Sequence, residues 1–169
     1  MKVVVTGGAG FVGSNLVRHL EHVPEVTETV VLDDMSFGFR ENLDGVRTTI
    51  VEGSILDEPL LEEVTAGAEA VVHLAARSSV PRSVAYPLAA HEANATGTIR
   101  VLEAARRAGD IHMVVASSSS VYGANDVLPK HEGLSTRPVS PYAASKLASE
   151  AYTLAWGHSY DVPVLALRF

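Results

Sequence analysis

The first sixteen residues, MKVVVTGGAGFVGSNL, constrain the fold of this chain more than any other stretch. A β-branched run over Val3–Val5 is followed by four closely spaced glycines, Gly7, Gly8, Gly10 and Gly13. They form two overlapping patterns, Gly-x-x-Gly-x-x-Gly and Gly-x-Gly-x-x-Gly. Glycine lets a backbone turn tightly and approach a large anion, and a helix N-terminus offers free N–H groups to it. The stretch therefore predicts a strand, a tight turn and a helix that together hold a phosphate group.

The rest of the chain alternates short β-branched runs with longer segments rich in alanine and leucine. Parallel strands that helices bury on both faces have this pattern. We therefore predict an α/β fold, a doubly wound parallel sheet with helices on both faces, formed by residues 1–169 as one domain. The predicted strands are 2–6, 29–33, 47–51, 70–74, 111–116 and 163–168. The predicted helices are 11–22, 57–66, 88–108 and 141–159, with a short turn or helix near 39–44.

Two predicted connections, Ala75–Pro87 and Ser117–Ser140, are long for simple loops in a compact domain. Each follows the C-terminal end of a predicted strand. In an open α/β sheet, ligands bind at that edge. Both segments are therefore expected to take part in a functional site.

The composition excludes several classes of function. Thirteen Lys and Arg against twenty Asp and Glu give a net charge of −7, which disfavours nucleic acid or an anionic membrane as the main partner. There is no cysteine, so disulfides and thiolate sites are excluded. The seven histidines follow no ligand spacing, so no metal site is expected. No run approaches the roughly 18 apolar residues of a membrane span, so we expect a soluble protein. The absence of cysteine fits a cytoplasmic location, which we also expect.

The second predicted strand ends in VVLDD, which places Asp33 twenty residues after Gly13. A carboxylate at this position can accept hydrogen bonds from the ribose hydroxyls of a dinucleotide bound at the glycine turn. It would also repel a 2′-phosphate, which favours NAD over NADP. The alternative interpretation is that Asp33 is an ordinary turn residue or helix cap.

Tyr142 and Lys146 lie near the start of the last predicted helix, in the run PYAASK. Their four-residue spacing puts both side chains on one helical face, so the ammonium group can lie close to the phenol. The preceding long segment begins ASSSSVYG at the end of a strand, where its hydroxyls could meet the phenol. Without that context, the pair would be interpreted as a surface contact.

The motifs taken together resemble one family. TGGAGFVGSNL, LDDMSFG, HLAA, EANATGT, SSSSVYG and PYAASK occur in the order found in the extended short-chain dehydrogenase/reductase superfamily, in its sugar-nucleotide epimerase and dehydratase branch. The resemblance covers the whole chain. It implies a Rossmann-like fold, NAD as cofactor, a UDP-sugar as substrate, and a 4-epimerase activity of the UDP-glucose/UDP-galactose type.

The resemblance also implies roles for individual residues. Tyr142 matches the catalytic base, and Lys146 matches the residue that binds the nicotinamide ribose and acidifies the phenol. Ser118 matches the catalytic hydroxyl that hydrogen-bonds the substrate oxygen, with Ser117 or Ser119 as alternatives. The implied cofactor-binding residues are Gly7, Gly10, Phe11, Val12, Gly13, Asp33, Asp34, Ser36, Ser54, Ile55, Leu74, Ala75, Ala76, Asn94, Tyr142 and Lys146.

The chain departs from the family pattern at Ser54, where the family often has an aspartate; the hydroxyl can still meet the adenine amino group, though less strongly. Dehydratases of this family typically carry acidic groups just after the catalytic hydroxyl, where this chain has Ser119 and Ser120. Without an acid there, hydroxide would lack a proton donor as it leaves, which favours an epimerase.

Several alternatives stay open at this stage. They are a UDP-glucuronate 4-epimerase, a sugar-nucleotide dehydratase, and an NAD-binding module without turnover. The last follows because family members continue into a C-terminal substrate domain, of order a hundred residues or more, that residues 1–169 do not contain. The resemblance further implies a homodimer, paired through helices 88–108 and 141–159.

Overall fold

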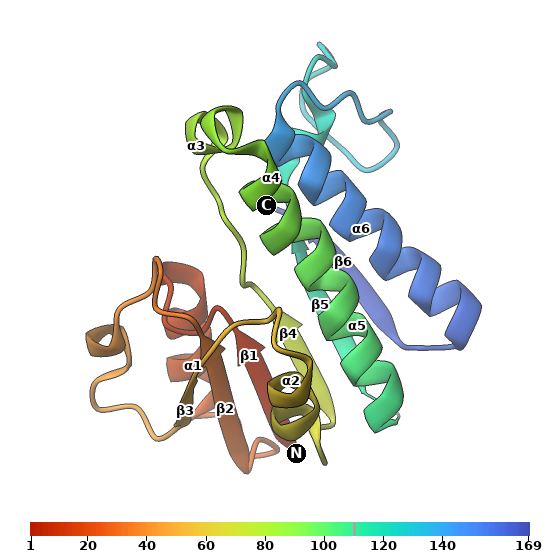
Figure 1. Cartoon of the computed structure of the whole chain (residues 1–169). Coiled ribbons are helices and arrows are strands. Elements are labelled where there is room, and N and C mark those ends of the chain that lie inside the picture. The colour runs from red at the N-terminus through yellow and green to blue at the C-terminus, as the bar shows by residue number, and fades with distance from the viewer. Residues whose placement is uncertain (110) are drawn as a thin grey trace.

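The computed structural model describes residues 1–109 and 111–169, and in this part of the chain parallel strands alternate with helices (Figure 1). The strands are β1 (Lys2–Thr6), β2 (Glu28–Asp33), β3 (Thr49–Glu52), β4 (Ala70–His73), β5 (His112–Ser117) and β6 (Val164–Arg168). The α-helices are α1 (Phe11–Leu20), α2 (Glu58–Thr65), α3 (Val80–Ala85), α4 (Pro87–His91), α5 (Gly97–Ala108) and α6 (Pro141–Tyr160). Three short helices complete the fold: the 3₁₀-helices η1 (Arg40–Leu43) and η3 (Ser119–Tyr122), and the π-helix η2 (Glu92–Thr96).

The strands form one parallel sheet in the order β3-β2-β1-β4-β5-β6. Thr6 at the end of β1 pairs with Leu32 on one side and with His73 on the other. The chain thus reverses its direction of travel across the sheet between β1 and β4. Loops that leave the sheet on either side of such a point separate and form a crevice, which places a ligand site at the C-terminal ends of β1 and β4. The predicted doubly wound, Rossmann-like fold is confirmed.

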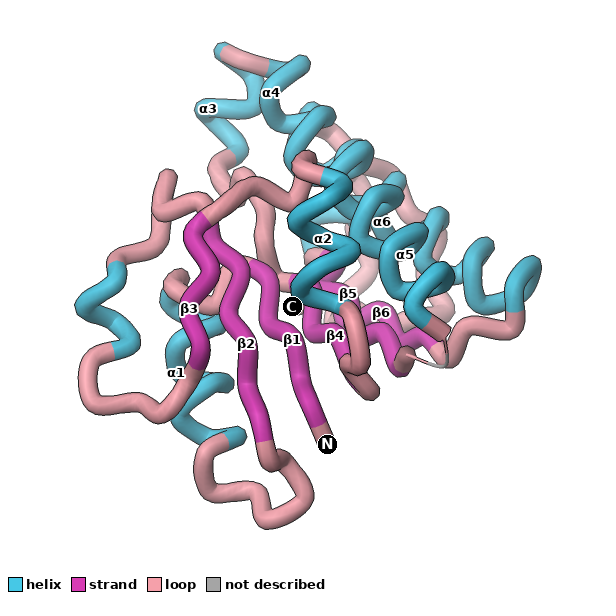
Figure 2. The backbone as a smooth tube through the Cα atoms, turned by 60° about the horizontal axis from the view of Figure 1, so that its bottom comes forward, coloured by secondary structure: helices cyan, strands magenta, loops and turns pink. Residues whose placement is uncertain are grey.

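Both faces of the central strands are buried, because their residues alternate between two apolar clusters. On one face, Val3, Val5 and Val31 pack with α1 and η1. On the other face, Val4 and Val71 pack with α2 and α5. Figure 2 shows α2, α5 and α6 on one side of the sheet and α1 on the other. Full burial of each of these valines contributes about 1.5–3 kcal/mol to the free energy of unfolding.

The cover of the sheet is uneven. Leu165 and Leu167 of β6 pair with Val114 and Ala116 of β5, and Val114 in turn pairs with Val72, which belongs to the cluster on the α1 side. The side chains of Leu165 and Leu167 are 52% and 38% exposed. Within residues 1–109 and 111–169, helices on the α1 side therefore cover β1–β3 more completely than β6.

The predicted strands, three of the predicted helices and the turn near 39–44 agree with the structure to within two residues. The prediction of one helix over 88–108 is wrong in detail, because the segment consists of α4, η2 and α5. The π-helix η2 carries Asn94, whose backbone carbonyl accepts hydrogen bonds from the Thr98 and Ser149 hydroxyls. These side-chain bonds at a carbonyl accompany the local change in helical pitch, a change that is common at functional sites.

The segment Ala75–Pro87, predicted as a loop, contains α3. The Ser79 hydroxyl accepts a hydrogen bond from Arg82 N at 3.3 Å and caps this helix, and Pro81 occupies its first turn. A helix of six residues shows too little periodicity to stand out in the sequence. The segment Ser117–Ser140 likewise begins with η3, which Ser118 caps. Across the described residues, no helix is long and apolar enough to cross a membrane.

Candidate functional site

The glycine turn lies at the C-terminal end of β1, where it closes against neighbouring backbone. Gly7 has a φ of +71°, and a Cβ atom there would lie 2.6 Å from Ala75 N. At Gly13, in the first turn of α1, a Cβ atom would lie 2.3 Å from Gly7 O. Both positions therefore require glycine. Because Phe11 is 84% and Val12 52% exposed, the N-terminal turn of α1 is open to a ligand.

Asp33 ties the end of β2 to this turn. Its carboxylate is buried and accepts one hydrogen bond from Ala9 N and another from Met35 N, each at 2.9 Å. The next carboxylate, that of Asp34, accepts a hydrogen bond from Ser36 N at 2.9 Å. The two aspartates thus hold the turn and the loop after β2 in place, and both line the cavity described next.

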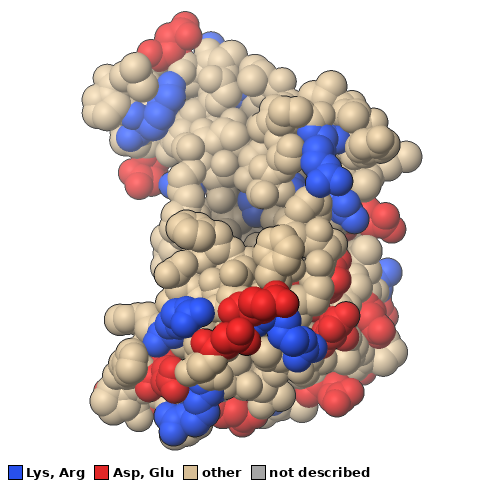
Figure 3. Space-filling view, turned by 90° about the vertical axis from the view of Figure 1, so that its left-hand side faces the viewer, with Lys and Arg blue, Asp and Glu red and all other residues tan. Residues whose placement is uncertain are grey.

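A cavity of about 560 Å³ opens between the loops that follow β1, β2, β3 and β4. Its volume lies within the range of small-molecule and cofactor sites, about 300–1,000 Å³. Figure 3 shows this side of the molecule hollowed across its middle. The glycine cradle at a helix N-terminus, beside a buried carboxylate, fits a dinucleotide. The predicted site residues that line the cavity are Gly7, Gly10, Phe11, Val12, Gly13, Asp33, Asp34, Ser36, Ser54, Ile55, Leu74, Ala75 and Ala76.

Other residues of the cavity wall were not singled out from the sequence. Three groups lie within or directly beside recognised motifs and site residues, and a wider window around those residues would have found them. The fourth group comes from α4 and η2, and only the packing of these helices brings it to the site. The four groups are Phe37 and Gly38, then Gly53 and Leu56, then Arg77 and Ser78, then Ala89, Glu92 and Ala93.

Asn94 does not line the cavity but fixes part of its wall. It is buried, and its Oδ1 atom accepts a hydrogen bond from Arg77 N at 2.7 Å. Its Nδ2 atom donates to Arg77 O at 3.2 Å and to Ser145 Oγ at 2.9 Å. One amide side chain therefore connects the segment after β4 with α6, the helix that carries Tyr142 and Lys146.

Tyr142 and Lys146 occupy the first turns of α6. The helix starts at Pro141, and the Ser140 hydroxyl caps it by accepting a hydrogen bond from Ala143 N at 3.1 Å. Tyr142 N donates to the Ser83 hydroxyl of α3 at 3.0 Å, so the helix that the sequence did not predict supports the start of α6. Tyr142 is half-buried, and Lys146 is 5% exposed.

Burial lowers the pKa of Lys146 from 10.5 to about 8. This shift corresponds to about 3 kcal/mol of unfavourable free energy in the folded protein at neutral pH. Among the described residues, no group makes a hydrogen bond with the Lys146 ammonium. A buried cation that costs stability without an internal partner is a candidate for binding a ligand or taking part in catalysis. Lys146 is mostly protonated at pH 7.

Ser118 lies directly after β5, and η3, which it caps, packs against α6. Its hydroxyl oxygen accepts hydrogen bonds from Ser120 N at 3.1 Å and from the Ser120 hydroxyl at 2.8 Å. The alternative Ser117 is buried and donates to Glu150 Oε2 at 2.6 Å, whereas Ser119 is exposed. Ser118, Tyr142 and Lys146 are not joined by hydrogen bonds within the described part of the chain, and the cavity wall does not include them.

His73 lies beneath the site at the end of β4. Its Nδ1 atom is 2.7 Å from the Thr6 hydroxyl and its Nε2 atom is 3.0 Å from the Thr98 hydroxyl. Burial, followed by the positive charge of Lys146, lowers the pKa of His73 to about 3. The ring is therefore neutral at physiological pH. Residues 1–109 and 111–169 contain no cluster of three or more metal-ligand side chains.

Comparison with known proteins identifies the relatives of this fold and site. The model of the NAD dependent epimerase/dehydratase family matches residues 3–169. The UDP-glucose 4-epimerase of Mycolicibacterium smegmatis is 41% identical over 171 residues, which cover 96% of this chain and 53% of that protein. A dTDP-glucose 4,6-dehydratase of the same organism is 35% identical over 168 residues, which cover 96% and 50%.

Solved structures give the same result. UDP-glucose 4-epimerase from Brucella ovis in complex with NAD has a TM-score of 0.91 at 33% identity, covering 99% of this chain and 51% of that chain. The dTDP-glucose 4,6-dehydratase from Streptomyces venezuelae with NAD bound has a TM-score of 0.95 at 38% identity, covering 99% and 55%. The chain thus spans about half the length of these relatives.

Proposed function

The chain belongs to the NAD-dependent epimerase/dehydratase family, and we propose that residues 1–169 form the cofactor-binding part of a UDP-hexose 4-epimerase of the UDP-glucose/UDP-galactose type. NAD is the cofactor of this family, and bound NAD supplies a reversible acceptor for the hydride at sugar C4. The UDP-glucose 4-epimerases among its relatives support the choice of substrate class.

The cavity is the proposed cofactor site. In this proposal the glycine turn and the N-terminus of α1 bind the pyrophosphate. Asp33, with Asp34 and Ser36 beside it, binds the adenosine ribose, and Ser54 and Ile55 lie at the adenine. The support is their common position on the wall of one cavity at the C-terminal edge of the sheet.

The proposed chemistry needs three side chains beyond the cavity wall. The Tyr142 phenol removes the proton from the sugar C4 hydroxyl and later returns it. The Lys146 ammonium, mostly protonated at pH 7, favours the deprotonated phenol and holds the ribose next to the nicotinamide. The Ser118 hydroxyl donates a hydrogen bond to the oxygen at C4 as it becomes a carbonyl. Positioned acid–base groups of this kind contribute about 10²–10⁴-fold to rate.

The run after β5 favours an epimerase over a dehydratase, and this observation carries the proposal. Loss of water from the sugar requires an acid beside the leaving hydroxyl, but Ser119 and Ser120 offer only hydroxyls. Glu150, the acid that is hydrogen-bonded to the end of β5, accepts from Ser117 and forms an ion pair with Arg168. That pairing holds the pKa of Glu150 below its usual range, so it does not carry a proton to donate at neutral pH.

The test uses a chain of family length that carries residues 1–169. With UDP-glucose, it should form UDP-galactose without added NAD, because the hydride is returned and no net oxidation occurs. Tyr142→Phe should lower turnover about 100-fold or more while NAD affinity is retained. Tyr86→Phe, a change of the same size at an exposed tyrosine, is the matched control and should leave turnover unchanged.

The products distinguish the alternatives. Formation of a 4-keto-6-deoxy sugar would show that the chain is part of a dehydratase. Turnover of UDP-glucuronate without turnover of UDP-glucose would show that it is part of a UDP-glucuronate 4-epimerase. The 169-residue chain by itself should bind NAD with little or no epimerisation. If the chain of family length binds NAD but turns over none of these sugar nucleotides, the protein is an NAD-binding module without catalytic activity.

A homodimer through α5 and α6 is also part of the proposal. On α6, Tyr152 and Tyr160 are 40% and 50% exposed, and both rings contact Trp156, which packs partly buried against the core. Leu154, 53% exposed, lies on another side of the helix. Exposed apolar side chains on a helix suit helix packing across a two-fold axis. Light scattering at tens of micromolar should give twice the monomer mass, and a monomer would contradict the proposal.

A further inference from the structure

The charged residues on the cavity wall are unevenly matched to a dinucleotide. Asp33, Asp34 and Glu92 contribute three carboxylates, whereas Arg77 is the one cationic residue on the described wall. A pyrophosphate brings two further negative charges. The partial charge at the N-terminus of α1, about half an elementary charge, cannot balance these groups. Arg77 is therefore the one side chain of the described cavity wall whose charge can offset that of a pyrophosphate.

The backbone of Arg77 is fixed at the mouth of the cavity. Its N–H and C=O groups are both hydrogen-bonded to the buried Asn94 side chain, at 2.7 and 3.2 Å. Its own side chain is exposed, and the central guanidinium carbon lies 5.8 Å from the centroid of the Phe37 ring. Phe37 comes from the loop after β2 and also lines the cavity. The contact therefore spans the opening between the loop after β2 and the segment after β4.

A second guanidinium joins the same ring. The Arg82 carbon, on α3, lies 4.9 Å from the centroid of Phe37. Two like charges thus gather at one aromatic ring, which attracts each of them weakly. Neither Arg77 nor Arg82 has a carboxylate oxygen within 4.0 Å among residues 1–109 and 111–169. This grouping repels itself unless an anion lies nearby, and Figure 3 shows basic side chains beside the hollow.

We propose that Arg77 is the cationic partner of the NAD pyrophosphate, with Arg82 adding positive charge beside it. The Phe37 ring is the platform that keeps both guanidinium groups at the mouth of the cavity. A guanidinium donates paired, charge-assisted hydrogen bonds to phosphate oxygens, which a helix N-terminus alone cannot do. The proposal rests on the cofactor of the family and not on the reaction, so failure of the epimerase assignment would leave it standing.

The test separates the phosphate groups from the rest of the ligand. Calorimetric titration of the 169-residue chain should show that Arg77→Ala weakens NAD and ADP binding about tenfold or more, because the charge-assisted hydrogen bonds to phosphate are lost. Adenosine, measured as a competitor of NAD, should bind the variant within about twofold of the unchanged chain. Since Arg77 is exposed and lies beside the like charge of Arg82, the unfolding temperature without ligand should not fall.

Two matched variants control for general effects of charge and of loop structure. Arg47→Ala removes one exposed guanidinium away from the cavity wall and should leave NAD affinity within about twofold. Phe37→Leu should weaken NAD binding about threefold, whereas Phe39→Leu, at an exposed phenylalanine that does not line the cavity, should not.

Salt provides an independent measurement. Raising the ionic strength should weaken NAD binding to the unchanged chain more steeply than binding to Arg77→Ala, because the variant lacks the charge that salt screens. Equal losses of NAD and adenosine affinity in Arg77→Ala, or no loss of NAD affinity, would overturn the proposal. Adenosine at its solubility limit could fail to displace NAD from the unchanged chain and from Arg77→Ala. In that case, an equal dependence of NAD affinity on ionic strength in the two proteins would overturn the proposal.

Discussion

The Ser117 hydroxyl donates a hydrogen bond to Glu150 Oε2 across 2.6 Å, which joins the end of β5 to the middle of α6. Glu150 also accepts from the Arg168 guanidinium of β6, whose Nη1 atom donates to the Tyr122 hydroxyl at 2.9 Å. The side chains of Glu150 and Arg168 are 8% and 19% exposed. The network thus links β5, β6, η3 and α6. Ser118 directly follows Ser117, and Tyr142 and Lys146 lie on the same helix as Glu150, so the network supports the segments that carry these three residues.

Removing one partner of this network should be costly. Glu150→Ala leaves the Arg168 guanidinium largely buried without its carboxylate, so the free energy of unfolding should fall by about 3 kcal/mol. The double variant Glu150→Met, Arg168→Met should recover part of that loss. Urea denaturation of the unchanged chain, of Glu150→Ala and of the double variant measures these free energies of unfolding.

The exposed pair Arg40–Glu52, whose side chains are 56% and 60% exposed, is the matched control for this network. Arg40→Ala should change the free energy of unfolding by no more than about 0.5 kcal/mol. A loss for Glu150→Ala as small as that of the control would show that the buried network does not stabilise the fold.

A second prediction concerns Lys146. Burial holds the pKa of Lys146 at about 8 when folded against about 10.5 when unfolded, so unfolding takes up a proton between these values. The energetic penalty is therefore fully present below pH 8 and disappears as the pH rises through 10.5. Lys146→Met, which keeps the apolar stem, should raise the free energy of unfolding at pH 7 by about 1–3 kcal/mol and should weaken NAD binding.

The gain from Lys146→Met should shrink as the pH approaches 10.5, and denaturation curves at pH 7 and pH 10 measure it. Lys130→Met, at a less buried lysine away from the cavity wall, is the control. Loss of stability in Lys146→Met at pH 7 would show that the ammonium group has an internal role in the fold.

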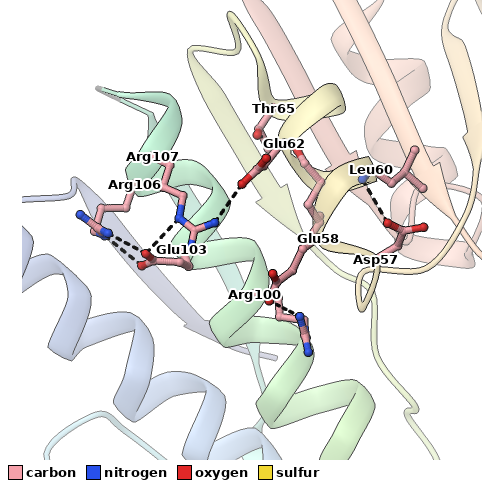
Figure 4. A network of polar contacts seen from close by, with 10 residues as sticks. Asp57, Glu58, Leu60, Glu62, Thr65, Arg100, Glu103, Arg106 and Arg107 are labelled. Atoms are coloured by element: carbon pink, nitrogen blue, oxygen red, sulfur yellow. Dashed lines mark hydrogen bonds and ion pairs between the residues drawn. The ribbon is translucent and has the colours of Figure 1, made fainter.

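The third prediction is an acid dependence set by His73. Its pKa is about 3 when folded against about 6.5 when unfolded, so the unfolded chain binds the proton first as the pH falls. Stability should therefore decrease below pH 6.5, by up to about 1.4 kcal/mol per pH unit. The pKa values of Glu150 and of Glu103, whose carboxylate pairs with Arg106 and Arg107 (Figure 4), are also lowered, but they change stability only below about pH 4.5. Between pH 7 and pH 5, the effect of His73 is therefore separate from theirs.

Denaturation between pH 7 and pH 5 measures the effect of His73, which should reach about 2 kcal/mol at pH 5. The His73→Asn amide can still hydrogen-bond to Thr6 or Thr98. In this variant, the decrease of the free energy of unfolding with falling pH should be smaller by up to about 1.4 kcal/mol per pH unit, which corresponds to one proton. The same slope in both proteins would exclude His73 as its source.

The fourth prediction concerns the choice between NAD and NADP. The buried Asp33 carboxylate on the cavity wall should repel a 2′-phosphate, so NAD at 100 times its Kd should stabilise the chain by about 2.7 kcal/mol and NADP far less. Asp33→Asn keeps an oxygen acceptor for Ala9 N, and it should reduce the difference between the stabilisation by NAD and that by NADP. Thermal unfolding at equal ligand concentrations checks this, and equal stabilisation of the unchanged chain by both ligands would refute the role of Asp33.

The sequence by itself determined the features that depend on neighbours along the chain. Val3–Val5, the glycines from Gly7 to Gly13, and Asp33 at a strand end predicted the parallel sheet and a cofactor cleft at its C-terminal edge, because strand alternation and turn chemistry are local. The comparisons confirm the family and NAD as its cofactor. The site roles of Ser118, Tyr142 and Lys146 remain predictions.

Only the tertiary structure decided which distant residues meet. Arg77 and Arg82 approach Phe37 across some forty residues of chain, and Glu150 lies between Ser117 and Arg168. Such contacts depend on how the sheet and helices pack, so local periodicity does not encode them. The same holds for the low pKa of Lys146, because burial, and not the identity of its sequence neighbours, sets the free energy of its charge.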